Sequence, residues 1–495
     1  MVEQTLFSLG YFLPEIVLVT TLCVMIITDL FISDRNVPGY LLLTGLGVAA
    51  ATLVLQGVSP DRIFFGMIAV DPFALFFKTL LLAATALIVL FSLHSAELRP
   101  FSSRIGEYYM LLTGMLLGMF LMVGSTHLLM MFLALELTSI SSYVLAGFLK
   151  NSLKSSEASI KYIIYGAVSS GVMLYGITLL IGVTGTADML LINEAIQSGA
   201  GNSLILNSAL LMILVGFGFK IAVVPFHFWA PDVYEGAPVT ITAYLAVASK
   251  MAAFAILIRF FTISFLDPAT FSPGENWTLL AGINWNIIGG GMAALAMIVG
   301  NLTALRQDNI KRMLAYSSIA HAGYLLMGVV ILSGQGVVSL MIYFVVYLFM
   351  NLGAFYIAML FSDKFGTFSI EGYKGLGQRA PFEGIAMTLF LVSLTGIPPT
   401  GGFVAKLYIF GAAISAGWIW LVVIAGITTI ISLFYYVRIV RNMFLYSPEE
   451  GLEKVHFSSG SRVILLLLMI PVALLGIYFS PLIKWAANSL EMIGM

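Results

Sequence analysis

Long apolar runs separated by short polar or glycine-rich turns occupy almost the whole chain. Each run approaches the ~20 residues that a helix needs to cross ~30 Å of hydrocarbon. No loop between them is long enough to form a separate domain. The pattern therefore predicts an all-α polytopic membrane protein with about fourteen transmembrane helices. The expected spans are roughly residues 11–32, 39–58, 72–94, 107–125, 127–148, 160–184, 205–228, 238–265, 284–304, 313–332, 338–360, 384–410, 415–440 and 462–484.

The composition agrees with this class. The chain is 60% hydrophobic and 9% charged, whereas about a quarter of the residues in a soluble domain carry charge. Its single cysteine, Cys23, excludes a disulfide framework and any iron–sulfur or zinc site built from this chain alone. The N-terminus has an acidic residue and no basic region, so we interpret the first apolar segment as a retained span and not as a cleaved signal peptide.

The lysines and arginines between the spans predict an orientation. If the N-terminus is outside, the loops after odd-numbered spans and the adjoining helix ends hold most of the cations, from Arg35 to Arg462. The opposite side holds only Arg62, Arg259 and Lys484. Because cationic residues favour the cytoplasmic side, we expect both termini on the outer side of the membrane.

Five ionisable residues lie well inside expected spans: Glu136, Lys161, Lys220, Lys250 and Lys406. A charge at such depth costs several kcal/mol or more, so it is rarely kept without a purpose. A series of interior lysines indicates a protein that moves protons or cations. Lys78 is different, because it lies close to a helix start beside Asp71, and we expect its side chain to snorkel to the membrane surface.

Each of these residues also has a structural interpretation. Glu136 could be a neutral carboxylic acid hydrogen-bonded between helices. Lys161 lies four residues after Glu157, so snorkelling and a helical ion pair would also explain it. His321 and His227 could carry protons between lysines, since imidazole titrates near neutral pH, or they could be packed and hydrogen-bonded. A haem held by these two histidines is a further alternative.

Two of the lysine-bearing spans contain helix breakers. Pro225 follows Lys220 in GFKIAVVPFHFW, and Pro398-Pro399 precede Lys406 in LTGIPPTGGFVAKL. Proline cannot donate a helical hydrogen bond, so each span should kink or break. Broken helices recur at ion sites in transporters, and two such spans five helices apart run in opposite directions, as an inverted repeat requires.

The segments HLLMMFLALELTSISSYVLAGF, SSEASIKYIIYGAVSSG, GFKIAVVPFHFWAPDVYEGAP and LTGIPPTGGFVAKL closely resemble the antiporter-like membrane subunits of complex I, the proton-pumping NADH:quinone oxidoreductase. The resemblance runs from about residue 105 to 445. It implies two inverted five-helix repeats, with discontinuous helices at spans seven and twelve. The implied organisation is an N-terminal three-helix segment (1–105), a first repeat (106–265), a second repeat (266–445) and a C-terminal helix (446–495).

The resemblance also implies roles for individual residues. Glu136, Lys161, Lys220, Lys250 and Lys406 match the family's proton-relay positions, and His321 falls where a relay residue of span ten is expected. The chain would be a non-redox subunit of a translocase, without a cofactor of its own. Quinone, FMN and iron–sulfur clusters are then expected on partner subunits, beside paralogous antiporter-like subunits in the same membrane.

Two features separate the paralogous types within this family. One type carries a glutamate in span twelve, where this chain has Lys406, and another extends into a C-terminal lateral helix for which we expect no room after span fourteen. The remaining fourteen-span bacterial type fits both features. A subunit of a multisubunit Na⁺/H⁺ antiporter and a stand-alone transporter of a small solute are the alternatives.

Overall fold

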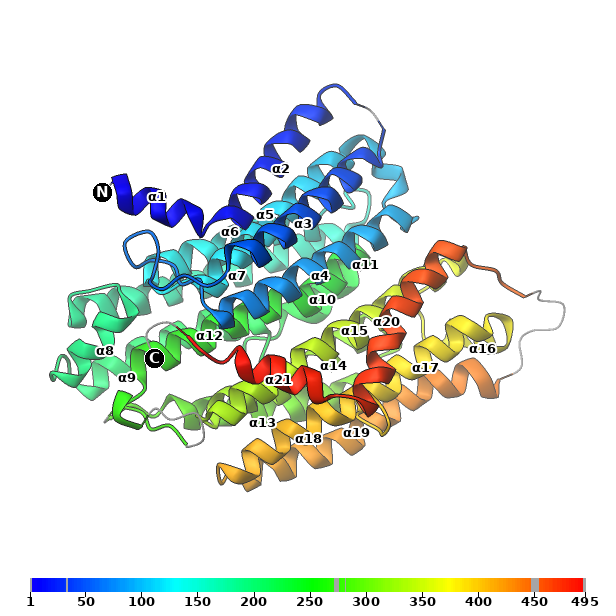
Figure 1. Cartoon of the computed structure of the whole chain (residues 1–495). Coiled ribbons are helices and arrows are strands. Elements are labelled where there is room, and N and C mark those ends of the chain that lie inside the picture. Colours follow the sequence, from blue (N-terminus) through cyan, green and yellow to red (C-terminus); the bar gives the residue numbers. More distant parts are fainter. Residues whose placement is uncertain (1, 33, 271–275, 281, 447–453, 493–495) are drawn as a thin grey trace.

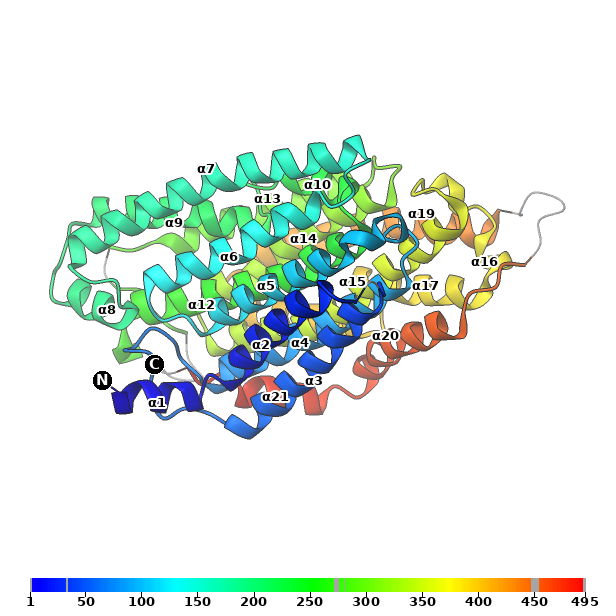
Figure 2. The same cartoon turned by 90° about the horizontal axis from the view of Figure 1, so that it is seen from above.

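The computed structural model describes residues 2–32, 34–270, 276–280, 282–446 and 454–492. Within this part of the chain the secondary structure is helical, apart from isolated β-bridges in the loops. Most helices run side by side in one bundle, and both ends of the chain lie at the same end of it (Figure 1, Figure 2). The all-helical membrane fold predicted from the sequence is confirmed.

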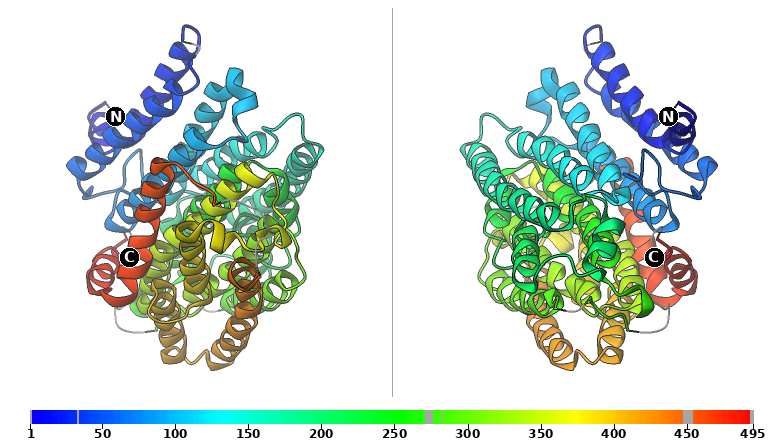
Figure 3. Two further views of the ribbon diagram at one scale, coloured as in Figure 1. Left: turned by 90° about the vertical axis from the view of Figure 1, so that its right-hand side faces the viewer. Right: turned by 90° about the vertical axis from the view of Figure 1, so that its left-hand side faces the viewer.

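The N-terminal helices form one edge of the bundle (Figure 3). α1 and α2 meet at a bend of 79°, and α2 packs against α3. Asp71 starts the fourth helix by accepting a hydrogen bond from the Ala74 backbone N–H at 2.8 Å, which satisfies one of the free donors of the first turn. The helices are α1 (Val2–Gly10), α2 (Leu13–Asp29), α3 (Val37–Gln56) and α4 (Pro72–His94).

The next group of helices contains an interrupted span. α9 ends at Ile221 because Ala222 adopts a left-handed conformation (φ 57°), and Pro225 lies before the start of α10. Trp229 Nε1 donates to the Phe219 carbonyl at 3.0 Å and so satisfies one acceptor freed at the helix end. The elements are a 3₁₀ turn (Arg99–Arg104), α5 (Ile105–Gly124), α6 (Leu128–Ala146), α7 (Leu153–Thr184), α8 (Met189–Gln197), α9 (Ser203–Ile221), α10 (Trp229–Gly236), α11 (Val239–Tyr244), a π-helical turn (Leu245–Ser249) and α12 (Lys250–Phe265).

The last group contains a second interrupted span. Pro398 and Pro399 separate α17 from α18. A Cβ atom at Gly402 would collide with the Ser393 carbonyl oxygen, so the close approach of the two half-helices requires glycine there. The elements are 3₁₀ turns (Pro268–Thr270 and Glu371–Tyr373), α13 (Trp285–Ala304), α14 (Ile310–Val330), α15 (Gly334–Phe365), α16 (Leu376–Arg379), α17 (Pro381–Thr395), α18 (Gly401–Ser415), α19 (Ile419–Leu445), α20 (Ser459–Ile477) and α21 (Ser480–Asn488).

Three spans form the centre of the bundle. The apolar windows of Val239–Phe265, Ile310–Val330 and Gly334–Phe365 are 100%, 94% and 89% buried inside the protein. In the end-on views these green and yellow-green helices lie between the N-terminal helices on one side and α18 with α19 on the other (Figure 3). Polar residues on the central spans are therefore shielded from lipid as well as from water.

Each expected span coincides with at least one helix, but the count of spans differs. The described residues contain 12 helices that are long and apolar enough to cross a membrane, or up to 13 if α1 and α2 form one span. The expected span 384–410 is divided into α17 and α18, each of which is too short alone. Fourteen spans, the repeats and the residue limits of the four segments stay predictions, and the last limit adjoins residues 447–453, outside the described part.

Two buried ion pairs involve α4 and the residue that starts it: one joins α4 to α2, and the other joins the start of α4 to α12. Lys78 Nζ lies 2.6 Å from Glu15 Oε1, with side-chain exposures of 0% and 1%. Snorkelling of Lys78 is therefore wrong, because its ammonium ends inside the protein. Arg259, which we assigned to the outer side, lies within α12 and binds both carboxylate oxygens of Asp71 at 2.7 and 2.8 Å.

Candidate functional site

Lys220 lies at the end of α9, where the interrupted span begins. Its side chain is buried, and Nζ donates to Ser139 Oγ of α6 at 3.0 Å. Glu136 lies one turn before Ser139 on the same helix and accepts from Ser170 Oγ of α7 at 2.5 Å. Among the described residues no ion pair joins Glu136 to Lys220. The structure thus brings the two residues to one region but gives each a hydroxyl partner.

Lys161 lies apart from the buried lysines, in a half-exposed network of charges. Its Nζ is 2.5 Å from Asp232 Oδ2 and 2.6 Å from Glu157 Oε1, and 37% of its side chain is exposed. Asp232 also pairs with Arg312 at 2.7 Å, and Glu235 pairs with Arg312 at 2.9 Å. The network holds α10, the short helix that follows the interruption, against α7 and α14.

The carboxylates of this network lie between the spans, and their ionisation follows from their surroundings. Burial raises the pKa of Asp232, but hydrogen bonds from Lys161 and Arg312 outweigh it and leave the pKa lowered. For Glu235, burial again raises the pKa, and bonds from Lys154 and Arg312 lower it below its usual value. Both carboxylates are therefore charged at neutral pH.

Lys250 follows directly after the π-helical turn in the most buried span. Its side chain is 1% exposed, and Nζ donates to the Ser318 carbonyl at 2.8 Å and to Ser318 Oγ at 2.7 Å. Tyr347 of α15 donates to the same hydroxyl at 3.1 Å. Since π turns recur at functional sites, the irregular turn that presents Lys250 to α14 supports a functional role for it.

His321 lies one turn beyond Ser318 on α14 and is buried. Its Nδ1 is 2.7 Å from the Tyr343 hydroxyl, and its Nε2 is 3.5 Å from the Tyr436 hydroxyl. Tyr436 in turn lies 2.5 Å from Ser317 Oγ. The imidazole therefore stands between two phenols, in a setting that can pass a proton in either direction.

Lys406 lies just after the second interruption. Its Nζ donates to the Thr395 carbonyl, freed at the end of α17, at 2.8 Å and to Thr429 Oγ1 at 3.2 Å. The ammonium also lies over the Tyr324 ring, 4.6 Å from its centre. Tyr324 is on α14, so one helix connects the surroundings of Lys250, His321 and Lys406.

The sequence analysis missed the hydroxyl groups that surround the lysines. Ser139, Ser318, Tyr324 and Tyr347 all contact a lysine or its partner, and none of them was singled out. The signal was available in MLAYSSIAHAGYLLMG, where polar residues at helical spacing mark one face of a span that should otherwise be apolar. His227 lies in the first interruption, buried, with its ring 4.4 Å from that of Phe228.

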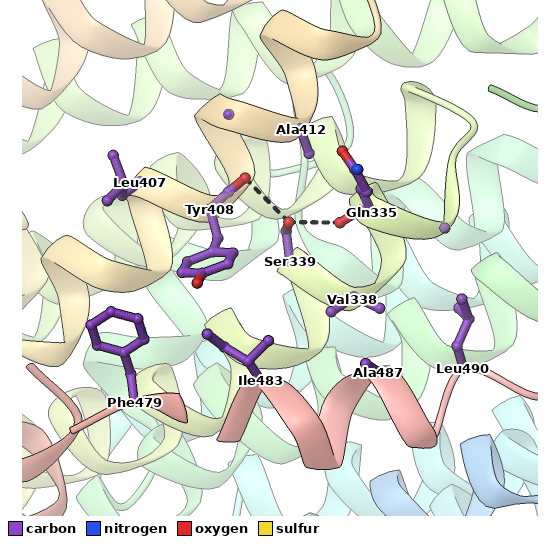
Figure 4. A pocket seen from close by; sticks show the side chains of 12 residues that line it. Gln335, Val338, Ser339, Leu407, Tyr408, Ala412, Phe479, Ile483, Ala487 and Leu490 are labelled. Carbon is purple, nitrogen blue, oxygen red and sulfur yellow. Dashed lines mark hydrogen bonds between the residues drawn. The ribbon is translucent and has the colours of Figure 1, made fainter. Parts of the chain in front are cut away.

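Neither of the two larger cavities in the described part of the chain is lined by the lysines, Glu136 or His321, although one is lined by Leu407 and Tyr408 and the other by Pro399 and Thr400. One of about 680 Å³ opens between α15, α18 and α21 and is lined mainly by apolar side chains such as Val338, Phe479 and Ile483. The Ser339 hydroxyl in this lining already has hydrogen-bond partners, since its Oγ donates to the carbonyls of Gln335 and Tyr408 (Figure 4). Within the described ranges no three His, Cys, Asp or Glu residues gather as metal ligands.

Known proteins share both the sequence and the fold. A family model described as NADH:quinone oxidoreductase/Mrp antiporter, TM, matches residues 125–432. The NADH-quinone oxidoreductase subunit N 2 of Chloroherpeton thalassium is 45% identical over 98% of this chain and 94% of that protein. Subunit N of Anaeromyxobacter sp. is 42% identical over 99% and 98%.

Solved structures agree with this result. A chain of respiratory complex I from Thermus thermophilus with bound aureothin is 29% identical, with a TM-score of 0.77, and the match covers 96% of this chain and 99% of that one. A chain of the Mrp complex from Dietzia sp. has a TM-score of 0.82 at 20% identity, covering 98% and 97%. The second likeness concerns the fold alone.

Proposed function

Because the chain belongs to the subunit N family of NADH:quinone oxidoreductase, within the membrane subunits shared with Mrp antiporters, we propose that its buried lysines form the proton relay of that complex. It is an antiporter-like membrane subunit of a multisubunit complex, beside paralogous subunits of its own kind. These relationships favour the complex I assignment over a separate antiporter subunit and over a stand-alone transporter.

The observation that carries the proposal is a row of polar side chains, one helical turn apart, on the central helix α14. Ser318 binds Lys250, Tyr324 lies under the Lys406 ammonium, and His321 stands between them on the same helix. In the first half, Lys220 of α9 donates to Ser139 of α6, which lies one helical turn from Glu136. We therefore assign Glu136, Lys220, Lys250, His321 and Lys406 to the relay, and Lys161 to its entrance at the charged network.

The free energy of moving a proton across the membrane sets how far the proton affinity of a relay group must change. Moving one proton against ~150 mV costs about 3.5 kcal/mol, taking ~2.3 kcal/mol per charge per 100 mV. The proton affinity of a relay group must therefore change about 300-fold between loading and release. A carboxylate roughly 8 Å from an ammonium contributes about 2 kcal/mol at an effective dielectric of ~20. A change in the charge or position of Glu136 alone would alter the proton affinity too little, so changes of hydration at the two interruptions must supply the rest.

Electron transfer is assigned to partner subunits. We infer that this chain is a non-redox subunit, and that the quinone, FMN and iron–sulfur clusters of the complex are bound by other chains. The protein is a multi-pass membrane protein, and we place it in the bacterial inner membrane with both termini outside, as the distribution of lysine and arginine favours. Pro225, Pro398 and Pro399 would give water and backbone groups room to rearrange beside the relay.

Vesicles that contain the assembled complex test this function. Lys220→Ala should abolish ΔpH formation at an equal rate of quinone reduction, because the first buried lysine is then missing. Lys374→Ala is the matched control, since Lys374 lies outside the spans with 43% of its side chain exposed. Full ΔpH in an intact Lys220→Ala complex would contradict the proposal.

A further inference from the structure

The buried pair of Glu15 and Lys78 lies outside the relay described above. Both side chains are shielded from lipid and water, and only one direct hydrogen bond joins them. Glu15 Oε2 is buried without a hydrogen-bond partner among the described residues. The Lys78 ammonium also lies over the Phe120 ring, 5.5 Å from its centre. One carboxylate oxygen is thus left free to accept a proton.

The neighbouring pair of Asp71 and Arg259 is built differently. Arg259 uses three nitrogens, binding both oxygens of Asp71 and the Val123 carbonyl. Asp71 also caps α4 through the Ala74 N–H. Guanidinium does not release its proton in proteins, so this saturated pair is a fixed structural connection. The Glu15–Lys78 pair leaves one carboxylate oxygen unbonded among the described residues, so a fixed structural connection does not explain it in the same way.

Two contacts fix the depth of Lys78 relative to Lys250. Asp71 binds Arg259, and Thr85, fourteen residues further along α4, lies 2.7 Å from the hydroxyl of Tyr244, fifteen residues before Arg259. α4 is therefore antiparallel to the span of α11 and α12. Lys78 lies midway between Asp71 and Thr85, which places its Cα level with that of Lys250.

The two ammonium groups point in opposite directions from this level. Helical side chains lean toward the N-terminus of their own helix. The Lys78 head therefore leans toward the end of the bundle that carries both chain termini, and the Lys250 head leans away from it. The rings of Phe77 on α4 and Phe254 on α12 both pack against that of Phe344 on α15, with ring centres 6.0 and 5.5 Å apart, so a charge on the pair acts on Lys250 through space.

We propose that Glu15 and Lys78 form a second proton-binding site that controls proton release from Lys250. Empty, the pair is an ammonium and a carboxylate with no net charge. When Glu15 Oε2 takes a proton from a hydronium ion, the O–H bond of the carboxylic acid forms as an O–H bond of hydronium breaks, and the pair then carries one positive charge. At roughly 12–15 Å and an effective dielectric of ~20, this charge weakens proton binding at Lys250 about sixfold to tenfold. The inference rests on the proposed proton translocation.

The test compares intact complexes carrying Glu15→Gln with wild type. In Glu15→Gln the positive charge of Lys78 is never neutralised, so the pair can no longer switch proton binding at Lys250. The ΔpH formed per quinone reduced should therefore fall. In infrared difference spectra of wild type, turnover should produce the C=O band of a protonated carboxylic acid, and this band should be absent from the variant. Thr85→Val is the matched control, because it removes a buried contact between α4 and Tyr244 without changing any charge, and it should keep the wild-type ratio in the assembled fraction.

A double variant keeps the test valid if Glu15→Gln does not fold, because replacing a buried ion pair by apolar residues is often tolerated. Glu15→Leu with Lys78→Leu should assemble and also show a reduced ratio. Wild-type ratios in both variants, with the infrared band unchanged, would overturn the inference. Lys220→Ala is measured in the same series. If it loses ΔpH while the Glu15 variants do not, only the second site fails, and if it keeps ΔpH, the proposed function itself fails.

Discussion

The first and second halves of the relay surround their lysines differently. In the first half, Lys220 has one hydroxyl partner, and Lys161 lies in a charged network open to water. In the second half, the buried side chains of Lys250 and Lys406 each donate to a backbone carbonyl and a hydroxyl. Under the proposed function this difference predicts separate tasks: the first half exchanges protons with the aqueous phase, and the second half holds and transfers them.

The largest effect is expected from the second half. Lys250→Met removes the amine that joins α12 to Ser318, and no water-exposed group can replace it. We expect loss of ΔpH by about a hundredfold or more, the range over which positioned proton carriers act. The measurement is ΔpH in vesicles at an equal rate of quinone reduction. Near-normal ΔpH in assembled complexes would show that the second half does not carry the proton.

A smaller effect is expected at His321. His321→Gln keeps a polar side chain but cannot take a proton, and it weakens the contacts with Tyr343 and Tyr436. Losing one hydrogen bond of this kind raises the barrier to proton transfer by about 1–1.5 kcal/mol, which slows it roughly tenfold. Single-turnover measurement of proton release would detect it. A loss as complete as that of Lys250→Met would make His321 an obligatory carrier.

The charged network should tolerate change better. Lys161→Gln breaks two ion pairs, but the site is half-exposed, where such pairs are worth up to about 1 kcal/mol and water can replace the lysine. We expect a reduction in ΔpH of no more than about fivefold. If Lys161→Gln abolished ΔpH as fully as Lys220→Ala, the division between the halves would be wrong.

The smallest effect concerns stability and pH. The pKa values of Asp232 and Glu235 are lowered in the folded protein. Their contribution to stability is therefore complete above the ordinary carboxylate pKa of ~4 and is lost as the pH falls through the lower folded values. Thermal unfolding of the complex should show Asp232→Asn less stable than wild type at pH 7, with the difference shrinking below about pH 4. A difference that grew on acidification would contradict this sign.

The sequence predicted the fold well because membrane spans are marked by the length of apolar runs. It also marked where the chain is interrupted, since Pro225 and Pro398-Pro399 lie between half-helices in the structure. The π-helical turn before Lys250 could not be predicted, because LAVAS contains no proline or glycine.

Contacts between distant segments were the other part that sequence reasoning missed. Lys78 looked like a snorkelling residue because its partner, Glu15, is 63 positions away. Ser139 and Ser318 look like ordinary span residues until Lys220 and Lys250 are placed beside them. Hydrogen-bond partners across a bundle depend on helix rotation and depth, which a single sequence does not encode locally.

The central claim is that the buried lysines work by releasing and rebinding protons, and Lys220→Arg tests it most directly. Arginine keeps the positive charge and a donor for Ser139 but does not deprotonate in proteins. The measurement is ΔpH in vesicles at an equal rate of quinone reduction, with assembly verified. The account predicts that ΔpH is lost as in Lys220→Ala. Wild-type ΔpH with arginine at this position would show that only a fixed charge is needed.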